Sequence, residues 1–246
     1  TSTADHIGRR RGRVPGSTRR CGLTASPHLR QTDERASSRR PLSLFSMDPI
    51  SVIVLAGGAS QRMGANKALL PLGDHETLVS RVVANLRALS DDIVLVSNSP
   101  ELYADLSVRH AADQFPGAGP LAGLHAGLLA ARHPWAFAAA CDMPLVDHRL
   151  VRFMLVLTAG HDVVAPRIGE SVEPLHALYN RACLPAIETR LLNDQRRVIS
   201  FYPDVRVRYV EEREIAIFDR TGRTFSNANT PEDWAKLQTL MSQELP

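Results

Sequence analysis

The fold is decided by residues 52–67, Val52-Ile53-Val54-Leu55-Ala56-Gly57-Gly58-Ala59-Ser60-Gln61-Arg62-Met63-Gly64-Ala65-Asn66-Lys67. The stretch opens with four apolar residues, three of them β-branched, which is typical of a buried parallel strand. Gly57 and Gly58 follow at once, and glycine lets a backbone adopt positive φ and approach a ligand closely. Arg62 and Lys67 supply positive charge against phosphate. The stretch therefore predicts a strand that leads into an anion-binding loop.

Two common phosphate-binding motifs are excluded from this loop. A P-loop needs Gly-Lys-Ser/Thr, whereas Asn66 precedes Lys67, and the dinucleotide fingerprint G-x-G-x-x-G is absent. An ordinary strand-to-helix turn is the alternative interpretation, because Gly-Gly is common after strands. The pattern that fits is L-A-G-G-x-x-x-R-M-G-x-x-K, which residues 55–67 match at every signature position. In this respect the loop resembles that of sugar-nucleotide-type nucleotidyltransferases.

Length and composition predict one α/β domain. A chain of 246 residues can bury a sizeable core, and with only 5% aromatic residues that core must be aliphatic. No apolar run approaches the ~18 residues of a membrane span. The three cysteines, Cys21, Cys141 and Cys183, form no C-x-x-C pair. We therefore expect reduced thiols, a cytoplasmic location and no zinc site.

Charge divides the chain into two parts. Residues 1–46 contain ten arginines and three acidic residues, whereas the remainder contains 19 basic and 23 acidic residues. We expect residues 1–46 to be a disordered tail and residues 47–246 to form the nucleotidyltransferase domain. The tail composition also fits an organelle transit peptide, but a strand only five residues after Met47 favours Met47 as the native start. The mildly acidic domain does not support a nucleic-acid partner.

Strand and helix patterns alternate along the domain. They predict a three-layer α/β/α sandwich with a mainly parallel sheet, and the resemblance of the glycine loop implies a Rossmann-like nucleotidyltransferase fold. The expected strands are 52–55, 93–96, a weak one near Val108, 135–141, 162–166, 173–179 and an edge strand at 205–210. The expected helices are 77–89, 100–106, 121–132, 147–159, 184–192, 194–201 and a last one that Thr230 caps and that runs to about Ser242.

Asp142 directly follows the most apolar strand. Ligands of open α/β sheets gather beyond the carboxyl ends of strands. A carboxylate there suits Mg²⁺, which takes one or two carboxylates together with substrate phosphates. The alternative is that Asp142 caps the helix expected from residue 147. A second loop, introduced by Asp113 and containing Gly119-Pro120, predicts a backbone wall around a ligand, and Gly123 and Gly127 predict close packing of the following helix on the sheet.

Several stretches together resemble one family. They are residues 55–67, Gly119-Pro120-Leu121-Ala122-Gly123, Asp142-Met143-Pro144, Glu173-Pro174-Leu175-x-Ala177-Leu178-Tyr179 and residues 227–233, Asn-x-Asn-Thr-Pro-Glu-Asp. In this order and spacing, residues 50–243 are similar to molybdenum cofactor guanylyltransferases.

The resemblance implies an enzyme that transfers GMP from GTP to molybdenum-bearing molybdopterin and releases pyrophosphate, with Mg²⁺ as cofactor. It implies that Arg62, Lys67 and Asp142 are catalytic and that Asp142 binds the metal. It assigns to the nucleotide Leu55, Ala56, Gly57, Gly58, Lys67, Asn98, Asp113 and Asp142, with Ser97 replacing Asn98 if the alignment shifts by one residue. Attack of a phosphate oxygen on an α-phosphoryl group needs positioning and charge neutralisation rather than a covalent protein nucleophile.

Two other functions remain open at this stage. One is a CTP-dependent cytidylyltransferase acting on the same pterin, which shares nearly all these motifs. The other is a non-catalytic chaperone that binds nucleotide or cofactor for molybdoenzymes, against which Lys67 and Asp142 count. We expect a monomer that interacts with a molybdenum-insertion protein and with molybdoenzyme clients. We expect no interaction with a membrane.

Overall fold

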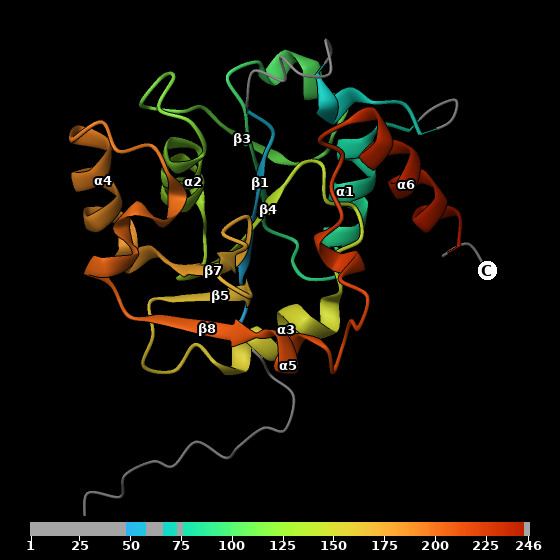
Figure 1. The fold of residues 1–246 in the computed structure, drawn as a ribbon. Coiled ribbons are helices and arrows are strands. Elements are labelled where there is room, and N and C mark those ends of the chain that lie inside the picture. The colour runs from blue at the N-terminus through green and yellow to red at the C-terminus, as the bar shows by residue number, and fades with distance from the viewer. Residues whose placement is uncertain (1–47, 58–65, 73–75, 244–246) are drawn as a thin grey trace, which may run out of the picture. The chain divides into compact units, whose positions relative to one another are not determined.

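The fold is seen in a computed structural model that describes residues 48–57, 66–72 and 76–243 (Figure 1). The expected disorder of residues 1–46, and the candidate site residues Gly58 and Arg62, lie outside the described residues. An eight-stranded sheet runs in the order β3-β2-β1-β4-β7-β5-β6, and β8 pairs with β5. Its strands are β1 (Ser51–Leu55), β2 (Ile93–Val96), β3 (Arg109–Ala111), β4 (Trp135–Ala140), β5 (Val163–Ile168), β6 (Ser171–Val172), β7 (His176–Asn180) and β8 (Val207–Glu211).

The sheet is mainly parallel, as predicted, with one antiparallel insertion. Parallel pairs join β1 to β2 and β4, β2 to β3, and β5 to β8. β7 lies antiparallel between β4 and β5, and β6 forms a hairpin with β5. Only a few residues separate β5, β6 and β7, too few for the crossover that parallel pairing needs. The antiparallel strands therefore follow from short connections.

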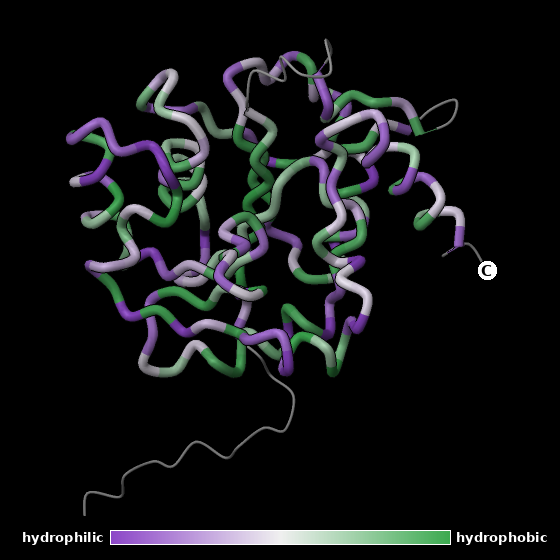
Figure 2. The backbone as a smooth tube through the Cα atoms, in the orientation of Figure 1, coloured by the Kyte–Doolittle hydropathy of each residue, from purple (hydrophilic) through white to green (hydrophobic). Residues whose placement is uncertain are grey.

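Helices cover both faces of the sheet, and the predicted three layers are confirmed (Figure 1). The helices are α1 (Leu78–Leu86), α2 (Pro120–Ala130), α3 (His148–Val156), α4 (Leu184–Leu192), α5 (Glu212–Ile215) and α6 (Pro231–Ser242). Side chains alternate across β1, so that Val52 and Val54 pack with α1 and α3, while Ile53 and Leu55 pack with α2 and α4. Figure 2 shows the hydrophobic strands at the centre of this arrangement.

Two glycines let α2 pack closely on the sheet. A Cβ added at Gly127 would collide with the Ile53 side chain, at 2.9 Å from Cδ1 and closer still to Cγ2. A Cβ at Gly123 would lie 3.0 Å from Leu55 Cδ2. The close packing expected at both glycines is confirmed.

Several expected boundaries are wrong. The helix at 194–201 is instead the 3₁₀ segment η4 (Val198–Asp204), because Asp194 adopts a left-handed φ of 55° and Arg197 is extended. The strand expected from residue 173 begins only at His176, since a turn closes from the His176 N–H to the Glu173 carbonyl. Helix 100–106 shortens to the 3₁₀ segment η2 (Pro100–Tyr103), helices 77–89 and 147–159 end three residues early, and β6, α5 and the 3₁₀ segment η5 (Arg223–Phe225) were not predicted.

The last helix matches its prediction and closes a third apolar cluster. Thr230 accepts a hydrogen bond from the Asp233 N–H and caps α6, with Pro231 at its first position. Leu237 and Met241 of α6 pack with Leu78, Leu145 and Ala228. Within the described ranges, no helix has the length and apolar character that crossing a membrane requires.

Candidate functional site

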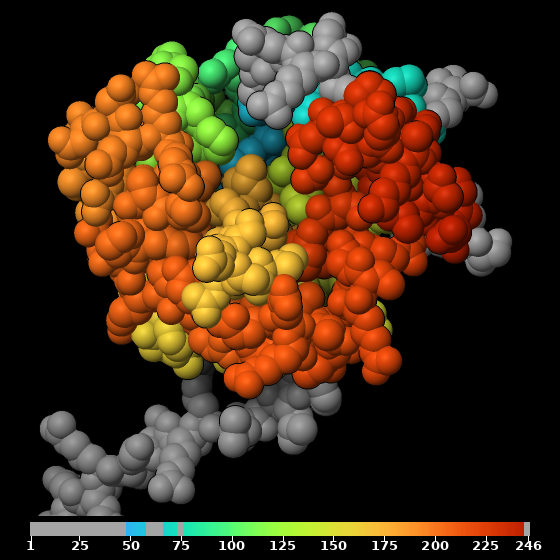
Figure 3. All heavy atoms as spheres, viewed as in Figure 1, coloured from blue at the N-terminus to red at the C-terminus, as the bar shows by residue number. Residues whose placement is uncertain are grey.

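A pocket opens at the carboxyl ends of β1 and β2. Its volume is about 360 Å³, and its lining comprises Leu55, Gly57, Val96, Ser97, Asn98, Asp113, Gly117, Gly119, Pro120 and Gly123. Four of the predicted nucleotide-binding residues, Leu55, Gly57, Asn98 and Asp113, therefore meet in one cavity. Ala56 lies beside them, buried, and its carbonyl accepts a hydrogen bond from Tyr103 Oη at 3.3 Å. In Figure 3 the surface is hollowed between the green loop before α2 and the red α6, with blue β1 at the floor.

Hydrogen bonds hold the polar side of this pocket. Asn98 Oδ1 accepts from the Asp113 N–H at 3.1 Å, and Asp113 Oδ1 accepts from the Phe115 N–H at 2.7 Å. Ser97 Oγ accepts from the Ser99 N–H at 3.1 Å. Ser97 and Asn98 thus both line the pocket, and the one-residue alternative between them remains open.

The opposite wall is backbone, as the Gly-Pro loop predicts. Gly117 and Gly119 adopt φ values of 78° and 74°, a left-handed conformation that glycine adopts without strain. Arg196 Nη1 donates a hydrogen bond to the Gly117 carbonyl at 3.0 Å. The Phe115 ring packs edge-on against His125, with centroids 5.4 Å apart. The loop is therefore tied to α2 and to the segment before η4.

A second group of side chains surrounds Lys67, which begins the 3₁₀ segment η1 (Lys67–Leu69). Lys67 Nζ lies 4.0 Å from Asp142 Oδ2 and donates to Asn229 Oδ1 at 2.7 Å. Asn229 Nδ2 in turn donates to Asn227 Oδ1 at 2.7 Å. Asn66 positions the lysine by capping η1, where Asn66 Oδ1 accepts from the Ala68 N–H. Residues 142 and 229 thus converge on the cation that ends the glycine loop.

Burial dominates the electrostatics at Asp142. Burial raises the pKa of the Asp142 carboxyl, and the nearby Lys67 ammonium offsets only part of the rise. The neighbouring Cys141 thiol has its pKa raised to about 12 by burial and by the Asp142 charge, so it stays protonated at neutral pH. A largely buried carboxylate with one cation at 4.0 Å favours an added positive charge. The thiol, by contrast, is no nucleophile.

The donor set at Asp142 fits magnesium better than a transition metal. The described ranges contain no cluster of three or more His, Cys, Asp or Glu side chains that could hold a metal. A lone carboxylate still suits Mg²⁺, because that ion completes its shell with phosphate oxygens and water.

The alternative role of Asp142 as a helix cap is wrong. Asp147 is the N-cap of α3, and its Oδ1 accepts a hydrogen bond from the Arg149 N–H at 2.8 Å. The Asp142 side chain is left to face Lys67.

Sequence reasoning assigned no role to Asn229. The signal was present as Asn227-x-Asn229 ahead of the α6 cap, but the pattern does not reveal which distant residue the amide contacts. Arg196, which reaches the Gly117 carbonyl, carried no signal at all.

Comparisons with known proteins agree on one family. A family model described as "MobA-like NTP transferase domain" matches residues 52–207. A probable molybdenum cofactor guanylyltransferase from Pelotomaculum thermopropionicum is 38% identical over 188 residues, which cover 76% of this chain and 91% of that protein. The molybdenum cofactor guanylyltransferase from Desulfosudis oleivorans is 35% identical over 196 residues, covering 79% and 97%.

Solved structures share the fold. Molybdopterin-guanine dinucleotide biosynthesis protein A from Archaeoglobus fulgidus matches with a TM-score of 0.70 and 26% identity, covering 79% of this chain and 100% of that one. The 2-C-methyl-D-erythritol 4-phosphate cytidylyltransferase from Thermus thermophilus matches with a TM-score of 0.58 at 17% identity, covering 79% and 99%, and shares the fold alone.

Proposed function

The chain belongs to the family of MobA-like NTP transferases, and from this premise we propose that it is a molybdenum cofactor guanylyltransferase. It transfers GMP from GTP to molybdenum-bearing molybdopterin and releases pyrophosphate. The observation that carries the proposal is the meeting of Lys67, Asp142 and Asn229 at the same sheet edge as the glycine-walled pocket. Relatives of 35–38% identity bear the same functional name over nearly their whole length.

The nucleotide base and ribose occupy the pocket between β1, β2 and the 113–119 loop. Leu55, Ala56, Gly57 and Gly58 supply the β1 side, and Asn98 and Asp113 supply the polar side. A pocket built from backbone and amide groups suits a nucleobase, because those groups donate and accept hydrogen bonds in fixed directions.

The triphosphate extends from this pocket toward Lys67. Lys67, with Arg62, neutralises phosphate oxygens, and Asn229 orients the Lys67 ammonium by accepting a hydrogen bond from it. Asp142 would hold Mg²⁺, which when bound supplies further positive charge at the reacting phosphoryl group. The acceptor phosphate of the pterin is already ionised at neutral pH and needs no strong general base. Positioning and charge therefore suffice for the transfer.

The partners follow from this reaction. GTP and molybdenum-bearing molybdopterin are the substrates. A molybdenum-insertion protein is the partner that precedes this reaction, and the molybdoenzyme clients are the partners that follow it. A monomeric state and a cytoplasmic location stay predictions.

Nucleotide selectivity is the decisive test. Isothermal titration of the full chain with GTP and with CTP, each with Mg²⁺, should show GTP binding at least about tenfold more tightly. Tighter binding of CTP would replace the proposal with the cytidylyltransferase alternative.

Catalysis needs its own measurement. Pyrophosphate release should require GTP and molybdenum-bearing molybdopterin together, and a reaction without molybdopterin serves as the matched control. Binding of GTP without any pyrophosphate release would instead support the non-catalytic chaperone.

A further inference from the structure

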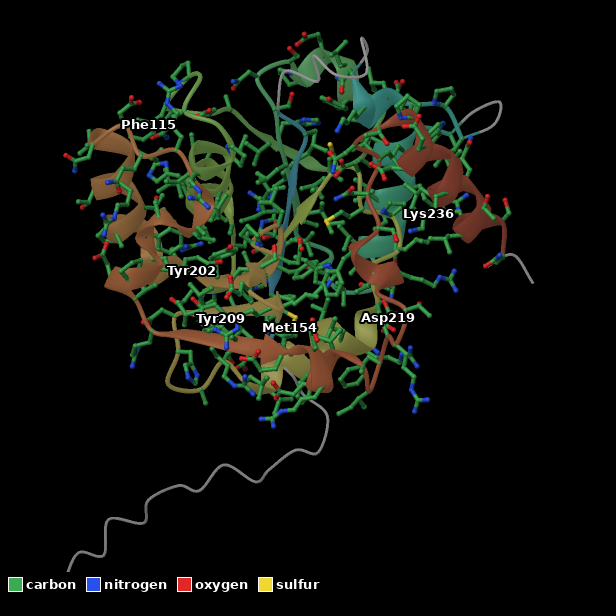
Figure 4. All side chains as sticks on the ribbon, in the orientation of Figure 1. Phe115, Met154, Tyr202, Tyr209, Asp219 and Lys236 are labelled. Carbon is green, nitrogen blue, oxygen red and sulfur yellow. The ribbon has the colours of Figure 1, made fainter. Side chains whose placement is uncertain are left out.

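A second and larger cavity lies away from the nucleotide pocket. Its volume is about 760 Å³, and it opens between α1, the 144–149 segment with α3, the 218–224 segment and the end of α6. It shares no lining residue with the nucleotide pocket. In Figure 4 its residue Asp219 lies beside α3 and below α6, toward the amino end of β1, whereas the nucleotide pocket lies at the carboxyl end. We name it the arginine cleft.

The arginine cleft concentrates positive charge in a domain that is acidic overall. Five arginines line it, one from α1, two from α3 and two from the 218–224 segment, against two aspartates: Arg81, Arg149, Arg152, Arg220, Arg223, Asp147 and Asp219. Residues 47–246 as a whole carry more acidic than basic side chains. The concentration is therefore local and does not reflect a basic domain.

Both aspartates of the cleft are already engaged. Asp147 caps α3 and pairs with Arg149 at 2.6 Å. Asp219 accepts hydrogen bonds from the N–H groups of Thr221 and Thr224 at 2.9 and 2.8 Å. For each carboxyl, burial alone would raise the pKa, but these hydrogen bonds outweigh it and the pKa is lowered. The carboxylates organise the walls and leave other cations unneutralised.

Arg152 and Arg220 are the unneutralised cations. Both are exposed, and neither has a hydrogen bond or an ion pair with any residue that the structure describes. His148, also in the wall, has a buried Nε2 without a partner there. Burial lowers the pKa of the His148 ring, so at neutral pH the ring is uncharged. It therefore adds no negative charge to the cleft. The guanidinium groups of Arg152 and Arg220 are thus available to bind an anion.

Guanidinium groups match phosphate oxygens in geometry, and small-molecule sites have volumes of roughly 300–1,000 Å³. We propose that the arginine cleft is a second binding site, which holds a small phosphate- or diphosphate-bearing ligand through Arg152 and Arg220. The ligand can be inorganic pyrophosphate or the phosphate group of an organic ester, and these share the same chemistry.

The test locates binding on the full chain. Hydrogen–deuterium exchange is measured with inorganic pyrophosphate in one arm and ribose 5-phosphate in the other. Amides of residues 144–152 and 218–224 should exchange more slowly in at least one arm, which also identifies the source of the phosphate. The ten arginines of residues 1–46 attract anions too, so local protection is the readout rather than total binding heat. Protection confined to other segments, or none at all, overturns the proposal.

Matched variants assign the effect to the two arginines. The double variant Arg152→Ala/Arg220→Ala should abolish the protection of both segments. Its apparent Kd for the phosphate-bearing probe should rise by about tenfold or more. Arg152→Lys/Arg220→Lys should retain part of the protection. Arg197→Ala is the control, because Arg197 is also exposed but lies outside the cleft. Removing exposed side chains should leave the thermal transition unchanged. Equal protection in the double alanine variant and in the control contradicts the proposal.

Discussion

Lys67 has two partners with different consequences. Its ammonium donates to Asn229 at 2.7 Å, whereas Asp142 stands 4.0 Å away. The amide contact holds the lysine in place, and the longer distance to Asp142 leaves this largely buried carboxylate only partly neutralised. Lys67 therefore fits a ground-state phosphate contact, and Asp142 fits a contact that matters most as charge builds during the reaction.

Replacing these two residues should separate binding from chemistry. Asp142→Asn keeps the shape but removes the charge, so turnover should fall on the order of 10²-fold or more while GTP affinity changes little. Lys67→Ala should weaken both, because its phosphate contact exists before the reaction. Steady-state pyrophosphate release and GTP titration of each variant measure the contrast.

One result would remove Asp142 from the metal site. If Asp142→Asn turns over at nearly the wild-type rate at limiting Mg²⁺, the carboxylate does not hold the cation.

His176 couples stability to pH. It is fully buried between the rings of Phe137 and Phe225, and neither ring nitrogen has a partner among the described residues. Burial lowers its pKa from 6.5 to about 3, despite the attraction of Asp147 and Asp219. Between these values the unfolded chain binds a proton that the folded chain does not, so the free energy of unfolding falls as pH drops below about 6.5.

The slope gives the test. Uptake of one proton on unfolding changes the free energy of unfolding by about 1.4 kcal/mol per pH unit. The free energy of unfolding measured by urea denaturation from pH 7.5 to 4 should contain a component with this slope. His176→Leu should lose that component. His110→Gln, at an exposed histidine, should keep it. Identical pH dependence of the free energy of unfolding for wild type and His176→Leu would contradict the prediction. It would mean that the pKa of His176 is the same in the folded and unfolded chains.

At the scale of elements, the contact between α2 and β1 positions the nucleotide pocket. Gly127 rests on Ile53, and the N-terminal end of the same helix carries Gly119 and Pro120 in the pocket wall. Interiors are packed too densely to absorb a new methyl group without movement. A change at Gly127 should therefore be felt at the pocket.

Gly127→Ala should destabilise the protein by about 1–3 kcal/mol, because the new Cβ meets the β-branched side chain of Ile53. It should also weaken GTP binding, since α2 must move. Gly123→Ala is the matched control for stability alone, because Gly123 itself lines the nucleotide pocket. Its new Cβ meets chiefly the end of the Leu55 side chain, and the change gains helix propensity. Urea denaturation and GTP titration measure both effects. Equal stability of the two variants would show that the sheet accommodates the extra methyl.

At the scale of the whole molecule, the question is what residues 1–46 contribute. Their Arg- and Ser-rich, aperiodic composition predicts that they add little to the core. A chain shortened to begin at Met47 should keep its melting temperature and its GTP affinity. Thermal denaturation and isothermal titration of the two lengths check this. A marked loss of either would mean that the segment packs on the domain.

The sequence by itself determined the features whose physics is local. Four consecutive apolar residues, three of them β-branched, predict a buried strand, and β1 is buried at every position. The Thr230-Pro231-x-Asp233 cap was equally predictable, because a cap depends on residues next to one another in the sequence. The glycines of α2 predicted a close approach to the sheet, but not that Ile53 and Leu55 are the side chains approached. The alternation of strands and helices also predicted that the Gly57 loop, the Gly119 loop and Asp142 would meet at the carboxyl edge of the sheet.

Only the tertiary structure decided which distant groups meet. Lys67 and Asn229 are 162 residues apart, and their hydrogen bond depends on how α6 packs against Leu78 and Leu145. The antiparallel place of β7, the choice of Asp147 over Asp142 as the cap of α3, and the gathering of five arginines from three elements are of the same kind. Such contacts follow from the packing of whole elements against each other, and no periodicity along the chain encodes that packing.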